Sequence, residues 1–291
     1  MTQLRPHVCV VGDLGIDVVA KLAGAVALGQ DTRAQVQFVP GGAGGNTAAW
    51  LARHHVDVSL IARVGDDEAG RTAAAELRSA GVDCRFAVDP RLPTCCVVIL
   101  VTADGDRTMV SDRGAGNAFC ADDVRLPEVA GRGHLHLSGY VLLDRGSRDA
   151  GLAALAAARR RGWSVSVDPQ AAQHITAVGR DAFLSWIQGA DLLLPNENEI
   201  TALGGIDAAL EAVDAVIVTN GRRGASWYSR SERLTTPAPG LHHTDSTGAG
   251  DAFNAGLLAS WLSGGTALEA LRAGVVAGSA AAARIGARPP D

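Results

Sequence analysis

Short, continuously apolar runs alternate along this chain with longer segments whose apolar residues recur at helical spacing. The runs have the length and composition of strands that are buried on both faces of a parallel sheet. Several helical segments end at a glycine, a common helix terminator. Repeated strand–helix–strand units of this kind predict an α/β fold with a largely parallel central sheet. Strands are expected at residues 7–11, 56–64, 134–139, 164–167, 192–194 and 216–218, and helices at residues 47–54, 68–80, 150–161 and 267–284.

Two stretches interrupt this rhythm. Residues 13–39 lack a helical period and contain short alternating segments, which predict antiparallel strands rather than core elements. Residues 94–112 contain an apolar run, the turn signal Asp104-Gly105 and a second strand-like segment after the turn, which together predict a β-hairpin. We therefore expect two parts. The α/β core comprises residues 1–12, 40–93 and 113–291, and a small β lid comprises residues 13–39 and 94–112.

The segment at residues 245–253 has the strongest chemical signal. Gly248, Ala249 and Gly250 stand directly before an apolar helix. Unpaired backbone N–H groups and the helix dipole make such a start attractive to anions, and the missing Cβ atoms let a phosphate approach. Asp251 follows at once, either to handle a proton or simply to complement the dipole. This segment alone favours neither interpretation.

A second glycine cluster fills four of the five positions from 41 to 45 and precedes a helix. So many glycines indicate that the backbone itself contacts something or turns sharply. Asn46, at the expected helix start, is most simply interpreted as an N-cap. Asp17, which follows the first strand, is most simply interpreted as a turn carboxylate.

Polar residues also follow later strands. Asn196 and Glu199 stand three apart at an expected helix start and could hold a hydrated Mg²⁺, although an ordinary capping segment has the same pattern. Thr219, Gly221 and Gly224 offer a second group of backbone N–H groups to phosphates. Because the carboxyl ends of parallel strands share one edge of the sheet, we expect all these residues to converge there.

Composition narrows the classes of function. Hydrophobic residues make up 47% of the 291 residues and charged residues 20%, which permits a sizeable core. A net charge of −5 argues against a nucleic-acid partner. Lys21 is the single lysine, so the chain has no Gly-Lys-Ser/Thr phosphate loop and is not a P-loop kinase.

Cysteine usage and hydropathy indicate the compartment. The five cysteines are scattered and form no C-x-x-C pair, which suits a reducing cytosol. No apolar run approaches the roughly 20 residues that a membrane span needs. We expect a soluble, cytoplasmic protein without a membrane partner.

Four segments occur in the order Gly12-Asp13-x-x-x-Asp17, Gly41-Gly42-x-Gly44-x-Asn46, Asn196-x-x-Glu199 and Asp245-Ser-Thr-Gly-Ala-Gly-Asp251. Together with Val64-Gly65-Asp66-Asp67-x-x-Gly70, they resemble the phosphofructokinase B / ribokinase family of carbohydrate kinases over essentially the whole chain. The resemblance implies a ribokinase-like three-layer core with a mainly parallel central sheet and a small β-sheet lid. It also implies transfer of the ATP γ-phosphoryl group to a hydroxymethyl oxygen of a sugar-like substrate.

The resemblance assigns roles to individual positions. Asp251 matches the catalytic base, and Gly248, Ala249 and Gly250 match the anion hole over the transferring phosphoryl group. A carboxylate at a helix N-terminus should have a lowered pKa, but a weak base suffices because the proton moves late in a loose transition state.

The remaining matched positions bind ligands and ions. Sugar contacts match Asp17, Gly41, Gly42 and Asn46. Nucleotide contacts match Asn196, Thr219, Gly221 and Gly224. Glu199 matches the segment that holds Mg²⁺ through water. Many members also bind a monovalent cation such as K⁺, and Asp245, the Thr247 carbonyl and the Gly286 region match that site.

Departures from the family pattern bear on the substrate. Ala43 stands where ribokinases and several phosphosugar kinases carry lysine, which favours an unphosphorylated pentose or ketohexose. Gly45 stands where alanine is commoner. Few aromatic residues are available to stack a base, although Phe119 or Tyr140 could line the pocket. A nucleoside kinase (adenosine, inosine or pseudouridine) stays open as the alternative, and a non-catalytic sugar-binding relative is less favoured. We also expect a homodimer through the lid.

Overall fold

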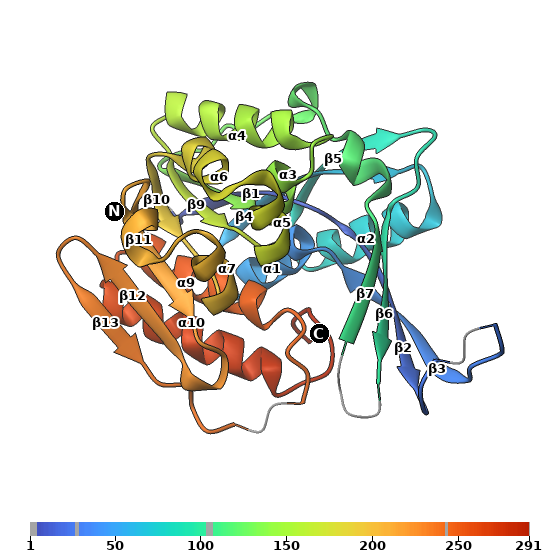
Figure 1. Cartoon of the computed structure of the whole chain (residues 1–291). Helices are drawn as coiled ribbons and strands as arrows, with labels where there is room; N and C mark the ends of the chain where they lie inside the picture. Colours follow the sequence, from blue (N-terminus) through green and yellow to red (C-terminus); the bar gives the residue numbers. More distant parts are fainter. Residues whose placement is uncertain (1–4, 27–28, 103–106, 242–243, 291) are drawn as a thin grey trace.

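A computed structural model of the chain describes residues 5–26, 29–102, 107–241 and 244–290. Within these residues, nine strands form a large sheet that carries helices on both faces (Figure 1). Four further strands form a small separate sheet that projects from the core. The predicted class, an α/β core with a mainly parallel sheet and a small second sheet, is confirmed.

The large sheet has the strand order β13-β12-β11-β10-β9-β8-β1-β4-β5, and its strands from β11 to β5 all pair in parallel. The order reverses at β1, since the chain adds β4 and β5 on one side and later strands on the other. Ligands gather at such a switch point. The strands are β1 (His7–Val11), β4 (Asp57–Gly65), β5 (Asp83–Asp89), β8 (Gly133–Ser138), β9 (Ser164–Asp168), β10 (Ala190–Leu193), β11 (Val213–Thr219), β12 (Ala225–Ser229) and β13 (Arg233–Thr236).

The six strands predicted for the core are all present. The sequence analysis missed β5 and β13, the two edge strands of the sheet, and β12, which lies between β13 and β11. Edge strands are only partly buried, so they carry polar residues and lack a continuous apolar run. β12 and β13 form an antiparallel hairpin rather than another parallel unit.

Successive residues of β1 pack into two hydrophobic cores, one on each face of the sheet. Val8 and Val10 pack with α1, α2, α9 and α10, whereas Cys9 and Val11 pack with α3 to α8. The helices are α1 (Ala43–Arg53), α2 (Glu68–Ser79), α3 (Tyr140–Leu143), α4 (Arg148–Arg160), α5 (Ala172–Val178), α6 (Arg180–Ile187), α7 (Glu197–Ala202), α8 (Ile206–Leu210), α9 (Ala249–Leu262) and α10 (Ala267–Ala282), with 3-10 turns η1 (Gly114–Ala118), η2 (Ala121–Asp123) and η3 (Gly221–Arg223). None of the described helices is long and apolar enough to cross a bilayer.

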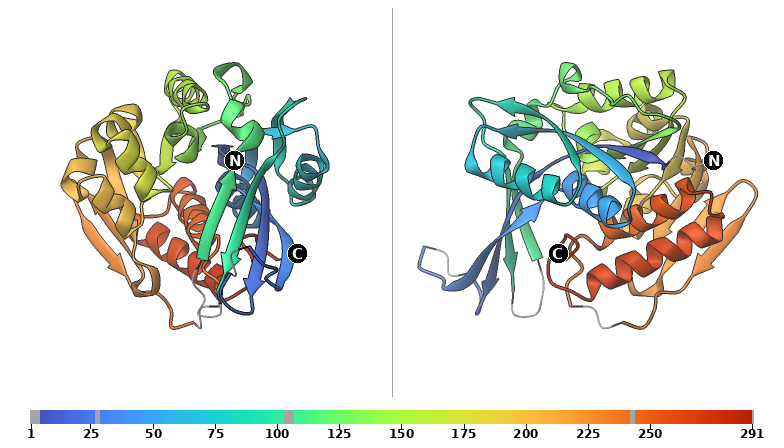
Figure 2. Two further views of the ribbon diagram at one scale, coloured as in Figure 1. Left: turned by 45° about the vertical axis from the view of Figure 1, so that its right-hand side comes forward. Right: turned by 180° about the vertical axis from the view of Figure 1, so that it is seen from behind.

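The small sheet, which we call the lid, has the order β3-β2-β6-β7. It projects on the side of the molecule where the C-terminal segment lies (Figure 2). Antiparallel pairs β2–β3 and β6–β7 are joined by a parallel pair between β2 and β6. The predicted turn Asp104-Gly105 lies outside the described residues. The strands are β2 (Gly15–Leu22), β3 (Ala34–Gly41), β6 (Cys95–Val101) and β7 (Arg107–Asp112), so β3 runs past the boundary expected at residue 39.

Candidate active site

Helix α9 begins at the glycine-rich segment. Gly248 is its N-cap, with a left-handed φ of 70° that favours glycine. The Ala249 N–H donates to the Ser246 carbonyl at 3.2 Å, so the tight turn already uses one donor of the expected anion hole. A Cβ at Gly250 would meet open space, which leaves the approach to the helix start clear. The Gly250 and Asp251 N–H groups lie in the first turn, where donors have no intrahelical acceptor.

Asp251 is the third residue of α9 and is buried. Its carboxylate accepts hydrogen bonds from Asn46 Nδ2 at 3.0 Å and Thr47 Oγ1 at 3.5 Å, both on α1. Burial, reinforced by the nearby Asp168 carboxylate, raises the pKa of Asp251 well above its usual value. The prediction of a lowered pKa is therefore wrong, because loss of water around a buried carboxylate outweighs the helix dipole.

Asn46 is not the N-cap of its helix. α1 begins at Ala43, after the N-cap Gly42, and Asn46 lies in its first turn with a buried side chain. The helix starts inside the glycine cluster because Gly44 packs against the backbone of the loop after β1. The capping interpretation is wrong for this reason: the amide of Asn46 contacts Asp251 across the site instead.

Asp17 and Gly41 meet where β2 and β3 emerge from the core. A Cβ at Gly41 would lie 2.2 Å from Asp17 Oδ1, so the carboxylate needs a glycine opposite it. Burial, with a contribution from Asp13, raises the pKa of Asp17 to about 6 even though Arg288 opposes the shift. Asp17 is thus a buried residue of β2 and not the turn carboxylate that the sequence first indicated.

Arg288, in the C-terminal segment, was missed by the sequence analysis. Its guanidinium donates to Asn46 Oδ1 at 3.4 Å and to the Gly41 carbonyl at 3.3 Å, and it lies 3.0 Å from Glu76. Its side chain is only 7% exposed. Arg288 therefore links Gly41 and Asn46, two of the residues that match sugar contacts. Gly45 packs against Arg288, since a Cβ there would lie 2.9 Å from the guanidinium.

A cavity of about 200 Å³ lies between α9 and the carboxyl ends of β9 to β11. It brings together residues that the sequence predicted from three separate segments. These are Asn196, Glu199, Thr219, Gly248, Gly250 and Asp251.

Two further residues of this cavity were missed. Asp168 ends β9 and accepts hydrogen bonds from Asn254 Nδ2 at 2.7 Å and from the Gln170 N–H at 3.0 Å. Asn254 lies one turn after Asp251 on α9. A sequence signal was available for Asp168, since it directly follows a predicted strand. Burial raises the pKa of Asp168, and burial together with the Asp168 charge raises that of Glu199.

The Asn196–Glu199 segment forms a true capping box at the start of α7. Asn196 Oδ1 accepts from the N–H groups of Asn198 and Glu199, and Glu199 Oε2 accepts from the Asn196 N–H at 2.8 Å. The capping interpretation is thus confirmed. Glu199 is nevertheless buried, and it lines the cavity together with Asp168 and Asp251.

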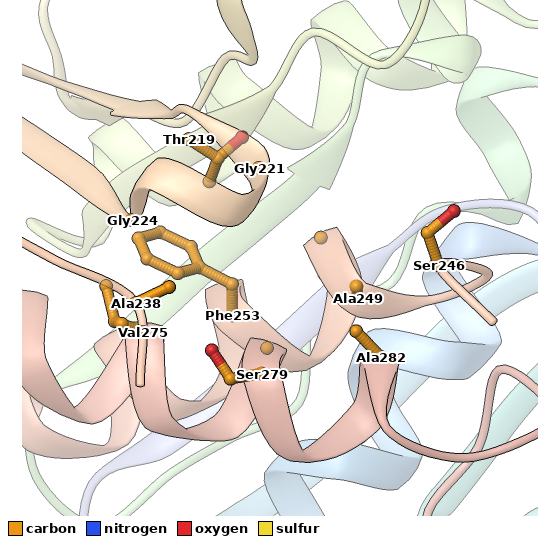
Figure 3. A pocket seen from close by; sticks show the side chains of 12 residues that line it. Thr219, Gly221, Gly224, Ala238, Ser246, Ala249, Phe253, Val275, Ser279 and Ala282 are labelled. Atoms are coloured by element: carbon orange, nitrogen blue, oxygen red, sulfur yellow. The ribbon is translucent and has the colours of Figure 1, made fainter. Parts of the chain in front are cut away.

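An apolar slot of about 150 Å³ adjoins the start of α9 (Figure 3). Thr219, Gly221 and Gly224 lie along one side, and small residues of α9 and α10 such as Ala249 and Ala282 lie along the other. Phe253 and Val275 provide apolar surface deeper in.

The positions matched to a monovalent cation also come together. Asp245 Oδ1 accepts from the Thr247 N–H at 2.8 Å and from Thr247 Oγ1 at 2.7 Å, and Oδ2 accepts from the Gly286 N–H at 3.2 Å. Arg107 on β7 adds a guanidinium, with Nη2 at 2.5 Å from Asp245 Oδ1 and Nη1 on Thr247 Oγ1. Burial opposes ionisation, but the hydrogen bonds from Thr247, Arg107 and Gly286 hold the pKa of Asp245 at about 2.

Parallel strands that end in polar residues, a helix N-terminus open to an anion and a buried carboxylate beside it define the class of protein: an α/β phosphotransferase. A model of the pfkB family of carbohydrate kinases matches residues 5–291. The chain belongs to this family, and is accordingly a sugar kinase that transfers phosphate to an alcohol group. The predicted family and enzyme class are confirmed.

Several known proteins are similar to this chain along most of its length. An ATP-dependent ribose-1-phosphate kinase from Halopiger xanaduensis is 31% identical over 85% of this chain and 82% of its own length. Fructokinase-1 of Zea mays is 30% identical over 89% of this chain and 84% of its own. An E. coli protein assigned as ribokinase II, crystallised with ATP and Mg²⁺, superposes with a TM-score of 0.84 and 26% identity, covering 97% of this chain and 94% of that one.

Proposed function

We propose that the protein is an ATP- and Mg²⁺-dependent kinase that phosphorylates a hydroxymethyl oxygen of a small unphosphorylated sugar, either a pentose or a ketohexose. The observation that carries this proposal is the position of Asp251. Its carboxylate lies at the anion-binding start of α9 and is hydrogen-bonded to Asn46. Arg288 contacts both Asn46 and Gly41, and Gly41 packs against the Asp17 carboxylate. Acceptor and phosphoryl donor would therefore meet at one carboxylate.

Asp251 is suited to accept the proton of the attacking hydroxyl. Its raised pKa makes it a stronger base than an exposed aspartate, provided that it is ionised in the working complex. The hydrogen bonds from Asn46 and Thr47 hold the carboxylate in one orientation. The N–H groups of the α9 start would stabilise charge on the transferring phosphoryl group. Positioning and charge stabilisation supply most of the catalysis in phosphoryl transfer.

Acceptor binding is assigned to Asp17, Gly41, Gly42 and Asn46. A buried carboxylate and a buried amide offer both acceptors and donors to sugar hydroxyls. The glycine opposite Asp17 keeps that carboxylate free of steric obstruction. Ala43 adds no cation beside this group, which supports an unphosphorylated acceptor, although one relative is named for a phosphorylated sugar.

Nucleotide binding is assigned to the slot beside Thr219, Gly221 and Gly224, with Asn196 near the phosphates. Mg²⁺ would neutralise phosphate charge when bound. No cluster of three acidic, His or Cys side chains among the described residues is close enough to ligate it directly, so binding through water is favoured. Asp168 and Glu199 fit this role, because both carboxylates line the cavity and burial raises their pKa values, so that a nearby cation would stabilise their charged forms.

A nucleoside acceptor is less well supported. Phe38 is 75% exposed and Phe119 is buried in the core. The Tyr140 ring is covered by the Arg113 guanidinium, 4.3 Å from its centroid. These rings are therefore poorly placed to stack a nucleobase. A cytoplasmic location stays a prediction, and the five cysteines, all free, are consistent with it.

The test is ADP release with a panel of pentoses, ketohexoses, phosphosugars and nucleosides. We expect turnover with an unphosphorylated sugar. Asp251→Asn should lower kcat by about 10²–10⁴-fold, because the general base is lost, while ATP binding by calorimetry stays nearly unchanged. Turnover restricted to nucleosides or to phosphosugars would overturn the assigned acceptor. Unaltered turnover of Asp251→Asn would overturn the assigned base.

A further inference from the structure

Arg107 connects the lid to the loop in front of α9. It is the first residue of β7, whereas Asp245 and Thr247 stand 138 and 140 positions later in the chain. The guanidinium uses both Nη atoms on these two residues, and the side chains of Arg107 and Asp245 are 25% and 16% exposed. A two-pronged contact of an arginine with a carboxylate and its neighbouring hydroxyl is geometrically specific.

This contact fills the position that the sequence assigned to a monovalent cation. A carboxylate offers about four lone-pair sites. Asp245 Oδ1 accepts from the Thr247 N–H, the Thr247 hydroxyl and Arg107, and Oδ2 accepts from the Gly286 N–H. A cation such as K⁺ needs oxygens with free lone pairs. Because Oδ1 is fully used and a guanidinium charge lies against it, the residues present do not fit a further cation while Arg107 is in place.

A positive charge at this point has a direct effect on the anion hole. Asp245 lies three residues before Gly248, so its negative charge would oppose phosphate binding if it were not neutralised. Hydrogen bonds to Asp245 also hold the turn that orients the N–H groups of the helix start. Arg107 both neutralises the carboxylate and fixes it. It acts through the loop, and so is a positioning residue.

We propose that Arg107 replaces a monovalent cation behind the anion hole, so that the enzyme works without K⁺ and its anion hole is complete only when the lid strand β7 is docked. The reasoning rests on the proposed kinase function of the α9 loop. It departs from the expectation that Asp245, Thr247 and Gly286 bind K⁺.

The experiment compares the wild type with Arg107→Gln in KCl and in tetramethylammonium chloride at equal ionic strength. We expect wild-type turnover to be the same in both salts. In Arg107→Gln, kcat should fall on the order of 10²-fold in tetramethylammonium chloride, the size of a lost anion-hole interaction, and recover in KCl because K⁺ can now reach Asp245. Arg33→Gln removes an exposed lid arginine of the same charge and should match the wild type in both salts.

A second readout does not depend on turnover. The Tm of Arg107→Gln should rise more in KCl than in tetramethylammonium chloride, whereas the wild-type Tm should not distinguish the salts. Arg107→Lys keeps the charge and serves if the glutamine variant does not fold; it should remain insensitive to K⁺. Strong K⁺ activation of the wild type, or an Arg107→Gln variant indifferent to K⁺ in both assays, would overturn the proposal. A wild type that phosphorylates no acceptor would instead remove the proposed function, and the Tm comparison would still decide the role of Arg107.

Discussion

At the scale of single residues, the site is governed by burial of charge. Asp17, Asp168, Glu199 and Asp251 are all buried carboxylates with raised pKa values. Asp245 differs, since its donors hold its pKa at about 2 although burial acts against them. The carboxylates with raised pKa values lie where substrate, nucleotide and Mg²⁺ are proposed to bind. Asp245, whose pKa is lowered, lies behind the anion hole.

Gly45 offers a test of close packing at this scale. Replacing a helical glycine by alanine normally favours the helix by roughly 1 kcal/mol. Here the added Cβ would lie 2.7 Å from Leu14 Cδ1 and 2.9 Å from Arg288 Nη2. We expect Gly45→Ala to lower the free energy of unfolding by about 1–3 kcal/mol and to raise the KM for the sugar, because Arg288 must move away from Asn46. Denaturant unfolding and steady-state kinetics measure both effects.

Gly24→Ala is the matched control for this substitution. A Cβ at Gly24 would meet nothing within 4 Å, so its stability and KM should stay at wild-type values. If Gly45→Ala proved as stable as the control, the packing argument for Arg288 would fail.

At the scale of elements, the two faces of the lid differ. Phe38, Val18, Val98 and Val110 lie in register across its four strands, so they share one face. Phe38, Val98 and Val110 are 75%, 36% and 59% exposed. Asp17, the neighbour of Val18, points to the opposite face. The lid thus directs one face toward the sugar residues and leaves an apolar face uncovered, which supports the proposed homodimer.

Phe38→Asp tests this dimer. A charge at the centre of an apolar interface should weaken association by tenfold or more, roughly the effect of losing an aromatic hot spot. Sedimentation or light scattering over a concentration series should then show monomers where the wild type is dimeric. Gln37→Asp adds the same charge to the other face and should leave the mass unchanged. A monomeric wild type would refute the dimer.

At the scale of the whole molecule, Asp17 links function to stability. Its native pKa of about 6 exceeds the ordinary 3.8, so the native state holds a proton that the unfolded chain has already lost between these values. The stabilisation is complete below about pH 4 and is lost as the pH rises through about 6. The Asp17→Asn variant has no carboxyl group to ionise at this position, so it does not lose this stability as the pH rises. We expect the variant to be more stable than the wild type by about 1–3 kcal/mol at neutral pH, with the difference vanishing near pH 4.

Denaturant unfolding at several pH values measures this effect, and sugar turnover should fall in the same variant. Asp31→Asn, an exposed lid aspartate, is the control and should show neither change. A stability difference that is independent of pH would mean that Asp17 ionises normally.

The sequence by itself determined the fold class, the family and most of the positions around the site. Apolar strand runs are local patterns, so all six core strands could be predicted, and the glycine-rich segments carry their identity in adjacent residues. Edge strands β5 and β13 escaped because partial burial leaves no continuous apolar run, and β12 escaped because serines interrupt its short sequence. Asn46 was assigned to a cap because a glycine cluster gives no local signal of where a helix begins.

Tertiary structure alone decided which charges are compensated. Arg107 and Arg288 reach the site from a lid strand and from the C-terminal segment, at sequence separations of 138 and 242 residues from the partners they contact. No local pattern marks such residues. The pKa of Asp251 was mispredicted for the same reason: a helix dipole can be inferred from neighbouring residues, but desolvation depends on everything that packs around the carboxylate.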